Sequence, residues 1–336
     1  MNELPGGNIV LGELPEGCKY CMKGGKLVLF ITGLCPVRCY YCPISRDKMG
    51  RDIIFANERP VKRLEDAIDE AMLMDAMGLG VTGGEPLVVL DRLIKYIRGF
   101  KRHFGKEFHI HLYTSGIGLN QSVLMNLVKA GLDEIRIHLT PHTDIESISR
   151  LSKIAPIDFG IEIPAIPGEE DRILNIMEYF ERRGNIDFYN INQMEFSESN
   201  ATALILRGFE LEEGEITAVK GSIDTAKKIL KHAIEMGIHS NIHVCTILYK
   251  DRVQTGLRLY RRAINIARPH EFVKDNGLIA KVRLEDPIEF VDLIKVYGTR
   301  NEIHVELLER IRGSSAFLVE ELPIHKRVMV EKIPVC

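Results

Sequence analysis

The chain has 336 residues, of which 45% are hydrophobic and 27% are charged. These fractions are average for globular proteins, which excludes a disordered or collagen-like chain. The 44 basic and 47 acidic residues give a net charge of −3, which excludes an overall polycation but not a local basic patch. The length suggests about two domains, or one α/β barrel with an appendage.

The cysteines are unevenly placed, because five of the seven lie between Cys18 and Cys42. An odd and clustered set argues against a disulfide framework and favours metal binding in a reducing compartment. The N-terminus lacks the basic start and apolar stretch of a signal peptide, and no run reaches the length of a membrane span. We therefore expect a cytoplasmic protein with no membrane partner.

From residue 26 to about 196, short strand-like runs alternate with helical patterns. Strands are predicted over residues 26–33, 78–84, 108–116, 133–140, 157–166 and 186–196. Helices are predicted over residues 61–77, 89–105, 120–130, 143–153 and 171–183. Six βα units with short connections indicate an α/β fold with a parallel sheet, either open and doubly wound or closed into a barrel. In both cases ligands are expected at the carboxyl ends of the strands.

Beyond residue 205 the rhythm changes. A helix is predicted over residues 213–237, a strand over 241–249, a further helix over 251–268 and a hairpin over 316–333. We interpret this region as a smaller α+β module. The predicted organisation is an N-terminal cysteine-containing arm (1–25), a core (26–204) and a C-terminal substrate module (205–336).

Three cysteines follow the first predicted strand directly. Cys35, Cys39 and Cys42 have the spacing C-x-x-x-C-x-x-C. Three thiolates on one short loop can bind three irons of a [4Fe–4S] cluster and leave the fourth iron open to a small chelating molecule. A structural zinc loop is the alternative use of such a motif.

This loop, with Tyr41 just before its last cysteine, resembles the defining motif of the radical S-adenosylmethionine (radical SAM) superfamily. A second motif of that family, the GGEP turn, is matched by Gly83, Gly84, Glu85 and Pro86 at the end of the second predicted strand. The resemblance implies that this turn binds the amino group of the cofactor's methionine portion. Consecutive glycines allow close backbone approach, and carbonyls with a carboxylate suit an ammonium group.

Weaker matches to the same family follow at later strand ends. The resemblance implies cofactor contacts for Ser115 on the third strand, for Glu162 on the fifth, and for Asn192 and the backbone of Met194 on the sixth. Each of these is alternatively a polar strand end whose hydrogen bonds are made within the protein. The resemblance extends over roughly residues 26–196.

The fold and chemistry that the resemblance implies are concrete. The core would be a partial (βα)6 TIM-like barrel that holds a [4Fe–4S] cluster and S-adenosylmethionine, with an electron donor such as ferredoxin or flavodoxin. Reductive cleavage of the cofactor would give a 5′-deoxyadenosyl radical that abstracts hydrogen from a substrate. The core is most similar to activating-enzyme-like members, with a C-terminal extension.

The substrate stays open at this point, and no catalytic side chain is assigned. Modification of RNA, of a peptide or protein, or of a metabolite fits the pattern, and a glycyl-radical-enzyme activase is one option within the class. The alternative class is a non-catalytic binding protein that is stabilised by metal.

A second cysteine pair lies in the N-terminal arm. Cys18 and Cys21 form a C-x-x-C-x-x-G turn that can hold one metal. Cys245 and Cys336 would complete four ligands, with His243 as an alternative. Zinc and an auxiliary iron–sulfur cluster fit this set equally well by ligand type, and free thiols are the third interpretation.

A local basic segment covers residues 248–283, where nine Lys and Arg residues stand against three acidic ones. Such a segment beside an active site suits a phosphate-bearing substrate such as RNA, or a protein substrate. The alternative is a helix face whose charges pair with nearby acids.

Overall fold

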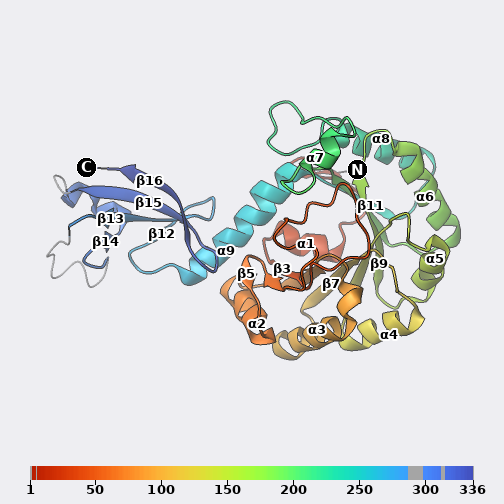
Figure 1. Cartoon of the computed structure of the whole chain (residues 1–336), viewed down its shortest axis with the longest axis horizontal. Helices are drawn as coiled ribbons and strands as arrows, with labels where there is room; N and C mark the ends of the chain where they lie inside the picture. Colours follow the sequence, from red (N-terminus) through yellow and green to blue (C-terminus); the bar gives the residue numbers. More distant parts are fainter. Residues whose placement is uncertain (1, 5, 287–297, 312–314, 336) are drawn as a thin grey trace.

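The computed structural model describes residues 2–4, 6–286, 298–311 and 315–335. It contains two sheets. A large sheet is wrapped by helices, and a smaller sheet near the C-terminus stands apart from it at the far end of α9 (Gly256–Ile266) (Figure 1).

The large sheet has the strand order β1-β2-β11-β10-β9-β8-β7-β6-β3-β4-β5. Its seven central strands run parallel. They are β3 (Lys26–Phe30), β6 (Gly78–Thr82), β7 (His109–Thr114), β8 (Glu134–His138), β9 (Asp158–Ala165), β10 (Phe188–Gln193) and β11 (Asn241–Cys245). Short antiparallel strands flank them: β1 (Asn2–Glu3), β2 (Ile9–Leu11), β4 (Phe55–Ala56) and β5 (Arg59–Pro60). The order does not close on itself, so the core is a partial barrel of the α/β class, as predicted.

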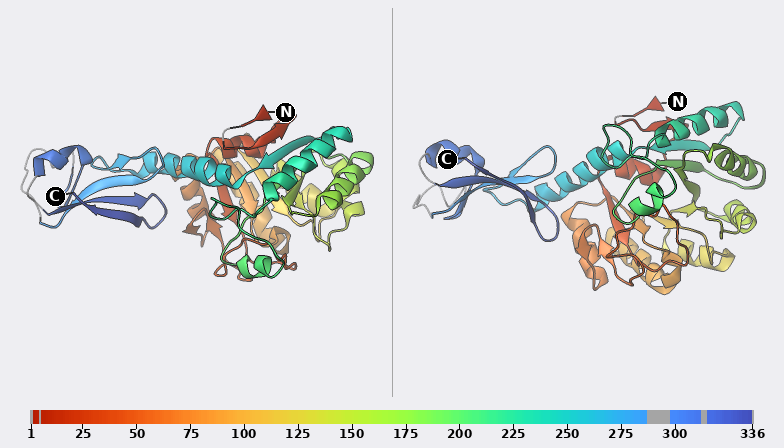
Figure 2. Two further views of the ribbon diagram at one scale, coloured as in Figure 1. Left: turned by 90° about the horizontal axis from the view of Figure 1, so that it is seen from above. Right: turned by 45° about the horizontal axis from the view of Figure 1, so that its top comes forward.

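Helices cover the outer face of this sheet (Figures 1 and 2). They are α2 (Leu64–Leu73), α3 (Leu90–Phe104) after the short η1 (Pro86–Val89), α4 (Gln121–Ala130), α5 (Ile145–Ile154), α6 (Glu170–Arg183) and α8 (Ser222–Glu235). The helix starts have local causes, since the Asn120 and Asp144 side chains accept hydrogen bonds from the first turns of α4 and α5.

The strands alternate between two faces, as a pleated strand requires. In β8, Ile135 and Ile137 are fully buried in the main hydrophobic core, whereas Arg136 and His138 line a cavity on the inner face. The inner face is therefore largely polar, although the strands are central to the sheet.

The predicted boundary at residue 204 falls inside the core, and the predicted number of six units is too low by one. α8 and β11 lie beyond this boundary, and β11 pairs in parallel with β10 from Phe188↔Asn241 to Asn192↔Cys245. The chain inserts α7 (Ala201–Ile205) and a long loop between β10 and α8, which interrupts the regular alternation. The separate module begins only after α9.

The C-terminal module is a five-stranded antiparallel sheet. Its strands are β12 (Phe272–Val273), β13 (Ile279–Leu284), β14 (Glu302–Ile303), β15 (Ala316–Leu322) and β16 (Val328–Pro334), with η3 at Val305–Ile311. The predicted C-terminal hairpin is present as β15 and β16. A small hydrophobic cluster that includes Val282, Leu284 and Ile303 forms its core.

The N-terminal arm is part of the barrel. Its helix α1 (Glu16–Met22) contacts β3, β6 and β7. The Gly17 N–H donates to Glu134, the first residue of β8, and the Tyr20 ring packs 5.4 Å from the ring of His109, the first residue of β7. Both partners lie at strand amino ends, so α1 closes this end of the barrel.

The basic segment packs against α2 and its neighbours. Arg262 forms a buried two-pronged pair with Glu70 (2.6 and 3.0 Å), Arg258 pairs with Glu58, and Arg261 pairs with acidic Asp75. Further along, Lys274 and Lys281 pair with glutamates of the C-terminal sheet. The charge excess that suggested an RNA interface is therefore largely neutralised, which favours the alternative of a paired helix face. No helix in the described ranges has the length and apolar character needed to cross a membrane.

Candidate active site

The inside of the barrel holds a cavity of about 1040 Å³. It extends from the loops after β3, β6 and β7, at the carboxyl ends of the strands, to the side chains of α1 at the opposite end. This volume is at the upper end of the range for small-molecule sites. We call the first end the rim and the α1 end the floor.

Cys35, Cys39 and Cys42 line the rim on the loop after β3, and all three are free thiols. The far side of this loop is tied to the segment before α7. The Asn200 amide donates to the Tyr41 carbonyl (3.1 Å), and the Ser199 hydroxyl donates to the Cys42 carbonyl (3.3 Å). The loop therefore has a fixed position at the rim.

These three thiols have the chemistry of cluster ligands. Burial raises the pKa of each of them, so without metal they stay protonated, and metal binding must release their protons. Their three sulfurs do not all lie within 4.8 Å of one another, so they are not placed to bind a single metal ion together. Wider spacing is expected for thiolates that bind different irons of one cluster, and the donor set fits a [4Fe–4S] group.

The Gly-Gly turn is packed against the cluster loop. The Gly84 N–H donates to the Thr32 carbonyl (2.8 Å) and the Glu85 N–H donates to the Leu34 carbonyl (2.7 Å). A Cβ at Gly84 would lie 2.3 Å from the Leu34 oxygen, and one at Gly83 would lie 2.4 Å from the Thr32 oxygen. Glycine is needed at both positions because the two backbones run in contact, and both glycines line the cavity.

The Glu85 carboxylate has a different role from the one expected. It is 1% exposed and accepts hydrogen bonds from the Thr114 hydroxyl (2.6 Å), from the Ser115 N–H (2.7 Å) and hydroxyl (2.5 Å), and from the Leu87 N–H (3.0 Å). It is thus fully used in joining the turn to the end of β7. An ammonium ligand would have to use backbone carbonyls of the turn, and buried Pro86 only begins η1.

Tyr41 reaches across the rim to β8. Its hydroxyl and His138 Nε2 are 3.1 Å apart, and the two rings meet edge to face. Burial lowers the pKa of His138, so the ring is neutral at pH 7. Tyr41 therefore ties the cluster loop to the carboxyl end of β8.

On β9 and β10, the predicted polar residues form one cavity wall. Glu162 accepts hydrogen bonds from the amides of Asn190 (2.7 Å) and Asn192 (2.6 Å). Met194 differs from the expectation, because its N–H donates to Ser222 (2.8 Å) and its carbonyl accepts from Val219 (3.0 Å). Its backbone N–H and carbonyl are thus used within the protein, and its side chain belongs to a buried hydrophobic cluster with Ile166, Leu204 and Val219.

The second cysteine group lines the same cavity. Cys18 and Cys21 on α1 lie at the floor, and Cys245 ends β11; all three are buried. The sulfurs of these three cysteines also do not all lie within 4.8 Å of one another. Cys336 lies outside the described residues. A second metal here stays a prediction.

His243, the alternative ligand, already has a partner. Asn8 Oδ1 accepts from the Thr246 N–H (2.8 Å), which fixes the amide so that its nitrogen donates to His243 Nε2 (3.0 Å). The ring is therefore neutral with its proton on Nδ1. Burial is the main cause that lowers the pKa of His243 to about 3. Nε2 is not free for a metal.

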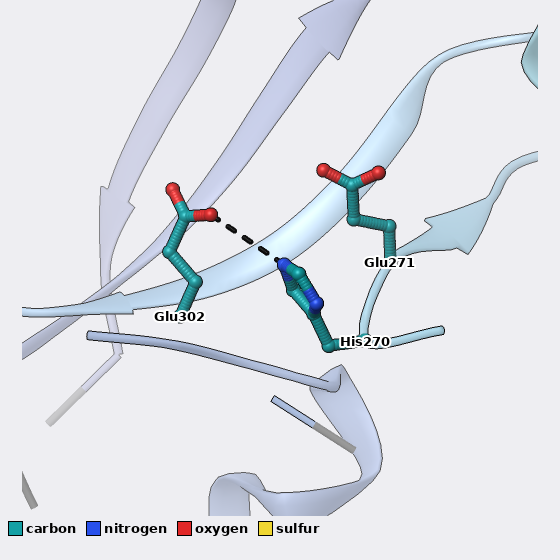
Figure 3. Close-up of side chains that lie close together, drawn as sticks. All are labelled: His270, Glu271 and Glu302. Carbon is teal, nitrogen blue, oxygen red and sulfur yellow. Dashed lines mark ion pairs between the residues drawn. The ribbon is translucent and has the colours of Figure 1, made fainter. Parts of the chain in front are cut away.

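One set of metal-type ligands was not expected from the sequence. His270, Glu271 and Glu302 in the C-terminal module place their ligand atoms within 4.8 Å of one another (Figure 3). The Lys281 ammonium lies 3.1 Å from Glu302 and 3.5 Å from Glu271, and Arg327 also pairs with Glu271. Because cations already neutralise these carboxylates, the group is an ion-pair network that joins β13 and β14 to the segment just before β12.

Several further polar residues that line the cavity were not singled out from the sequence, among them Lys26, Arg136, Asn190 and Lys250. Three of these four are strand residues that alternate with apolar neighbours. A charge inside a strand that is central to the sheet was the available signal for Lys26 and Arg136.

Three thiols at the rim of a partial parallel barrel, beside a glycine turn and above a large cavity, define an enzyme that carries an iron–sulfur cluster with an open coordination site. Residues 29–145 match the model of the radical SAM superfamily. The chain is also 39% identical, over 325 residues, to the Methanocaldococcus jannaschii protein named "Putative glycyl-radical enzyme activating enzyme MJ0021". That alignment covers 92% of this chain and 84% of the relative. The chain belongs to the radical SAM superfamily.

Solved structures show weaker similarity. Streptococcus suis SuiB bound to its precursor peptide SuiA has a TM-score of 0.47 at 12% identity, over 67% of this chain and 50% of SuiB. BtrN in complex with AdoMet and 2-DOIA has a TM-score of 0.33 at 14% identity, over 41% of this chain and 56% of BtrN. The family assignment depends on the sequence matches.

Membership confirms the predicted enzyme class and its cofactors. Superfamily members use a [4Fe–4S] cluster and S-adenosylmethionine. Cys35, Cys39 and Cys42 fit the cluster, and the adjacent cavity of about 1040 Å³ has the size of a small-molecule site. The non-catalytic alternative is thereby excluded.

Proposed function

We propose that this enzyme abstracts hydrogen from a substrate that enters the barrel cavity between the rim and the floor. The observation that carries the proposal is the convergence of the three rim cysteines, the glycine turn and the polar walls of β8 to β10 on one cavity. When bound and reduced, the cluster and S-adenosylmethionine supply the abstracting 5′-deoxyadenosyl radical.

The chain's own residues would hold and enclose the reactants. Cys35, Cys39 and Cys42 would ligate the cluster, and the backbone of Gly83 and Gly84 would contact the cofactor's methionine portion. Glu162 would bind hydroxyl groups through its second carboxylate oxygen, which is buried and accepts no hydrogen bond within the described ranges. α1 shuts the opposite end and so limits water entry at the floor.

The test is anaerobic turnover with dithionite and S-adenosylmethionine. The reconstituted protein should have a brown chromophore and release 5′-deoxyadenosine. Replacing Cys35, Cys39 and Cys42 with Ala should abolish both, whereas replacing Cys245 with Ala should keep the rim chromophore. A fully loaded, reducible protein that forms no 5′-deoxyadenosine would refute the proposal.

A protein substrate is the second candidate, because the M. jannaschii relative is named as an activating enzyme. A specific surface feature favours it. Ile205, Leu206, Leu211 and Ile216, in and after α7, are between 51% and 90% exposed. This segment follows the Ser199–Asn200 bonds to the cluster loop, so an apolar surface lies next to the rim.

The activase option predicts a stable product radical on another protein. Reduced enzyme and S-adenosylmethionine should generate a glycyl-radical electron paramagnetic resonance signal in an anaerobic extract of the source organism. The Leu206→Ser and Ile216→Ser double variant should keep 5′-deoxyadenosine formation without partner and lose that signal. If active enzyme produced no such signal, the activase option would be rejected, and hydrogen abstraction from a substrate enclosed in the cavity would stand as the function.

The remaining partner and location follow from the cofactor. A low-potential donor such as ferredoxin or flavodoxin would reduce the cluster. The six cysteines among the described residues are free thiols, three of them at an open rim, which favours a reducing compartment, so we place the enzyme in the cytoplasm.

A further inference from the structure

The cavity is lined by three cationic side chains, Lys26, Arg136 and Lys250. Lys26 begins β3, Arg136 is the central residue of β8, and Lys250 follows β11 in η2 (Tyr249–Thr255). The three act on one region: besides burial, the positive charges of all three lower the pKa of His243. We call them the cationic cluster.

The available carboxylates serve only one of the three. Arg136 is 2.5 Å from Glu134 and 3.6 Å from Glu162. For Lys26 and Lys250, no carboxylate oxygen of the described residues lies within 4.0 Å of the ammonium. Lys26 donates instead to the Tyr113 hydroxyl (3.3 Å), to which Arg136 also donates (3.3 Å).

Neither lysine is an exposed surface residue, since Lys26 and Lys250 are each only partly accessible to solvent and line the cavity.

An ammonium that is withdrawn from water without a partner is unfavourable, and an anion in the cavity removes that penalty. We propose that the cationic cluster binds an oxyanion of the substrate, a carboxylate or a phosphate, in the cavity. This assignment rests on the proposed function, since it names the class of molecule from which hydrogen is abstracted: a small anionic compound.

The location explains how the substrate would be oriented. Cys35, Cys39 and Cys42 follow the carboxyl end of β3, whereas Lys26 begins that strand and donates to the same Tyr113 hydroxyl as Arg136. An oxyanion held by Lys26 and Arg136 would therefore be anchored away from the cofactor, and Lys250 would contact it from the segment after β11. The neutral part of the substrate then points toward the rim, where hydrogen is abstracted. A glycine in a polypeptide loop offers no oxyanion for this anchor, so the proposal separates the small-molecule substrate from the activase option.

The test is anaerobic calorimetry on the reconstituted holoenzyme saturated with S-adenosylmethionine, in chloride buffer of constant ionic strength. Inorganic phosphate and malonate are the two probes. The probe that binds more tightly shows whether the site prefers a phosphate or a carboxylate. Lys26→Met and Lys250→Met should each weaken binding of that probe by at least roughly tenfold. Lys19→Met is the matched control, because Lys19 is on α1 but exposed and paired with Glu16, and its affinity should equal wild type.

Thermal unfolding gives a second readout. Without added anion, Lys26→Met should melt at or above the wild-type temperature, because it removes an unpaired charge; with the anion present, wild type should be the more stable. If one of the two lysine variants fails to load its iron–sulfur cluster, the other variant provides the test. The proposal would be overturned if neither probe showed saturable binding. It would also be overturned if wild type, Lys26→Met and Lys250→Met bound the probe with equal affinity. Formation of 5′-deoxyadenosine is measured separately, so an active enzyme without an anion site refutes this inference and leaves the proposed function standing.

Discussion

The contact between the glycine turn and the cluster loop makes Gly84→Ala a sharp perturbation. The added Cβ would lie 2.3 Å from the Leu34 oxygen, 2.7 Å from the Leu34 carbonyl carbon and 3.0 Å from Cys35 Cβ. Gly84 does not have a left-handed φ, so alanine is compatible with its backbone conformation. The substitution therefore tests contact alone.

The size of the effect follows from these distances. Moving the Leu34 oxygen from 2.3 Å to an acceptable 3.0 Å requires a shift of about 0.7 Å, and the atoms that must move are backbone atoms next to Cys35, a proposed cluster ligand. Misplacement of reacting groups by about 1 Å can cost about a hundredfold in rate. We expect 5′-deoxyadenosine formation per bound cluster to fall roughly 10- to 100-fold.

The assay is single-turnover 5′-deoxyadenosine formation under dithionite, normalised to iron content. Gly256→Ala is the control, since a Cβ there meets no atom within 4 Å and the residue begins α9. It should keep the wild-type rate. A wild-type rate per cluster in Gly84→Ala would show that the two backbones do not constrain one another, and the positioning argument would fail.

Three further outcomes are expected. Glu85→Gln should lower the unfolding free energy by about 3 kcal/mol in urea melts, because the amide cannot accept every hydrogen bond that the carboxylate accepts. Arg262→Met should cost about 3–5 kcal/mol by leaving the Glu70 charge buried and unpaired, whereas Arg261→Met, whose partner is exposed, should cost less than about 1 kcal/mol. The pKa of His243 is lowered to about 3 in the folded protein, so the unfolded chain binds the extra proton below pH 6.5. Cluster-free protein should thus lose stability as pH falls from 6.5 toward 3, by up to roughly 1.4 kcal/mol per pH unit, and His243→Gln should flatten this slope; an unchanged slope would contradict it.

Much of the core could be predicted because local patterns and tertiary structure agree. The run that became β3 is apolar, ends at a glycine and leads directly into the three-cysteine loop, so its place and its chemistry could be read together. The seventh strand was assigned to the wrong unit for a physical reason. β11 looks like any buried strand, and only its parallel register with β10 shows which sheet it joins.

The site was predicted less completely than the fold, since its residues act through contacts that spacing does not encode. Glu85 was found by its motif, yet its carboxylate faces Thr114 and Ser115 instead of a ligand. Lys26 and Arg136 belong to no motif, and a polar residue that alternates with apolar ones along a strand normally indicates a solvent-exposed face. In a curved parallel sheet the same alternation lines the interior, and the polar residues then belong to the site.

One strand connects the two ends of this interior. β3 begins with Lys26 at the inner end and runs five residues toward the loop that carries Cys35. At about 3.3 Å per residue the strand alone spans roughly 13 Å between its first and last Cα atoms. An oxyanion held beside Lys26 and a radical formed beside the cluster loop are thus separated by a fixed length of backbone. The enzyme should therefore select substrates by the distance between their anionic group and the hydrogen that is removed. Helix α1 forms the floor of the cavity and so limits how far a substrate can extend from the rim.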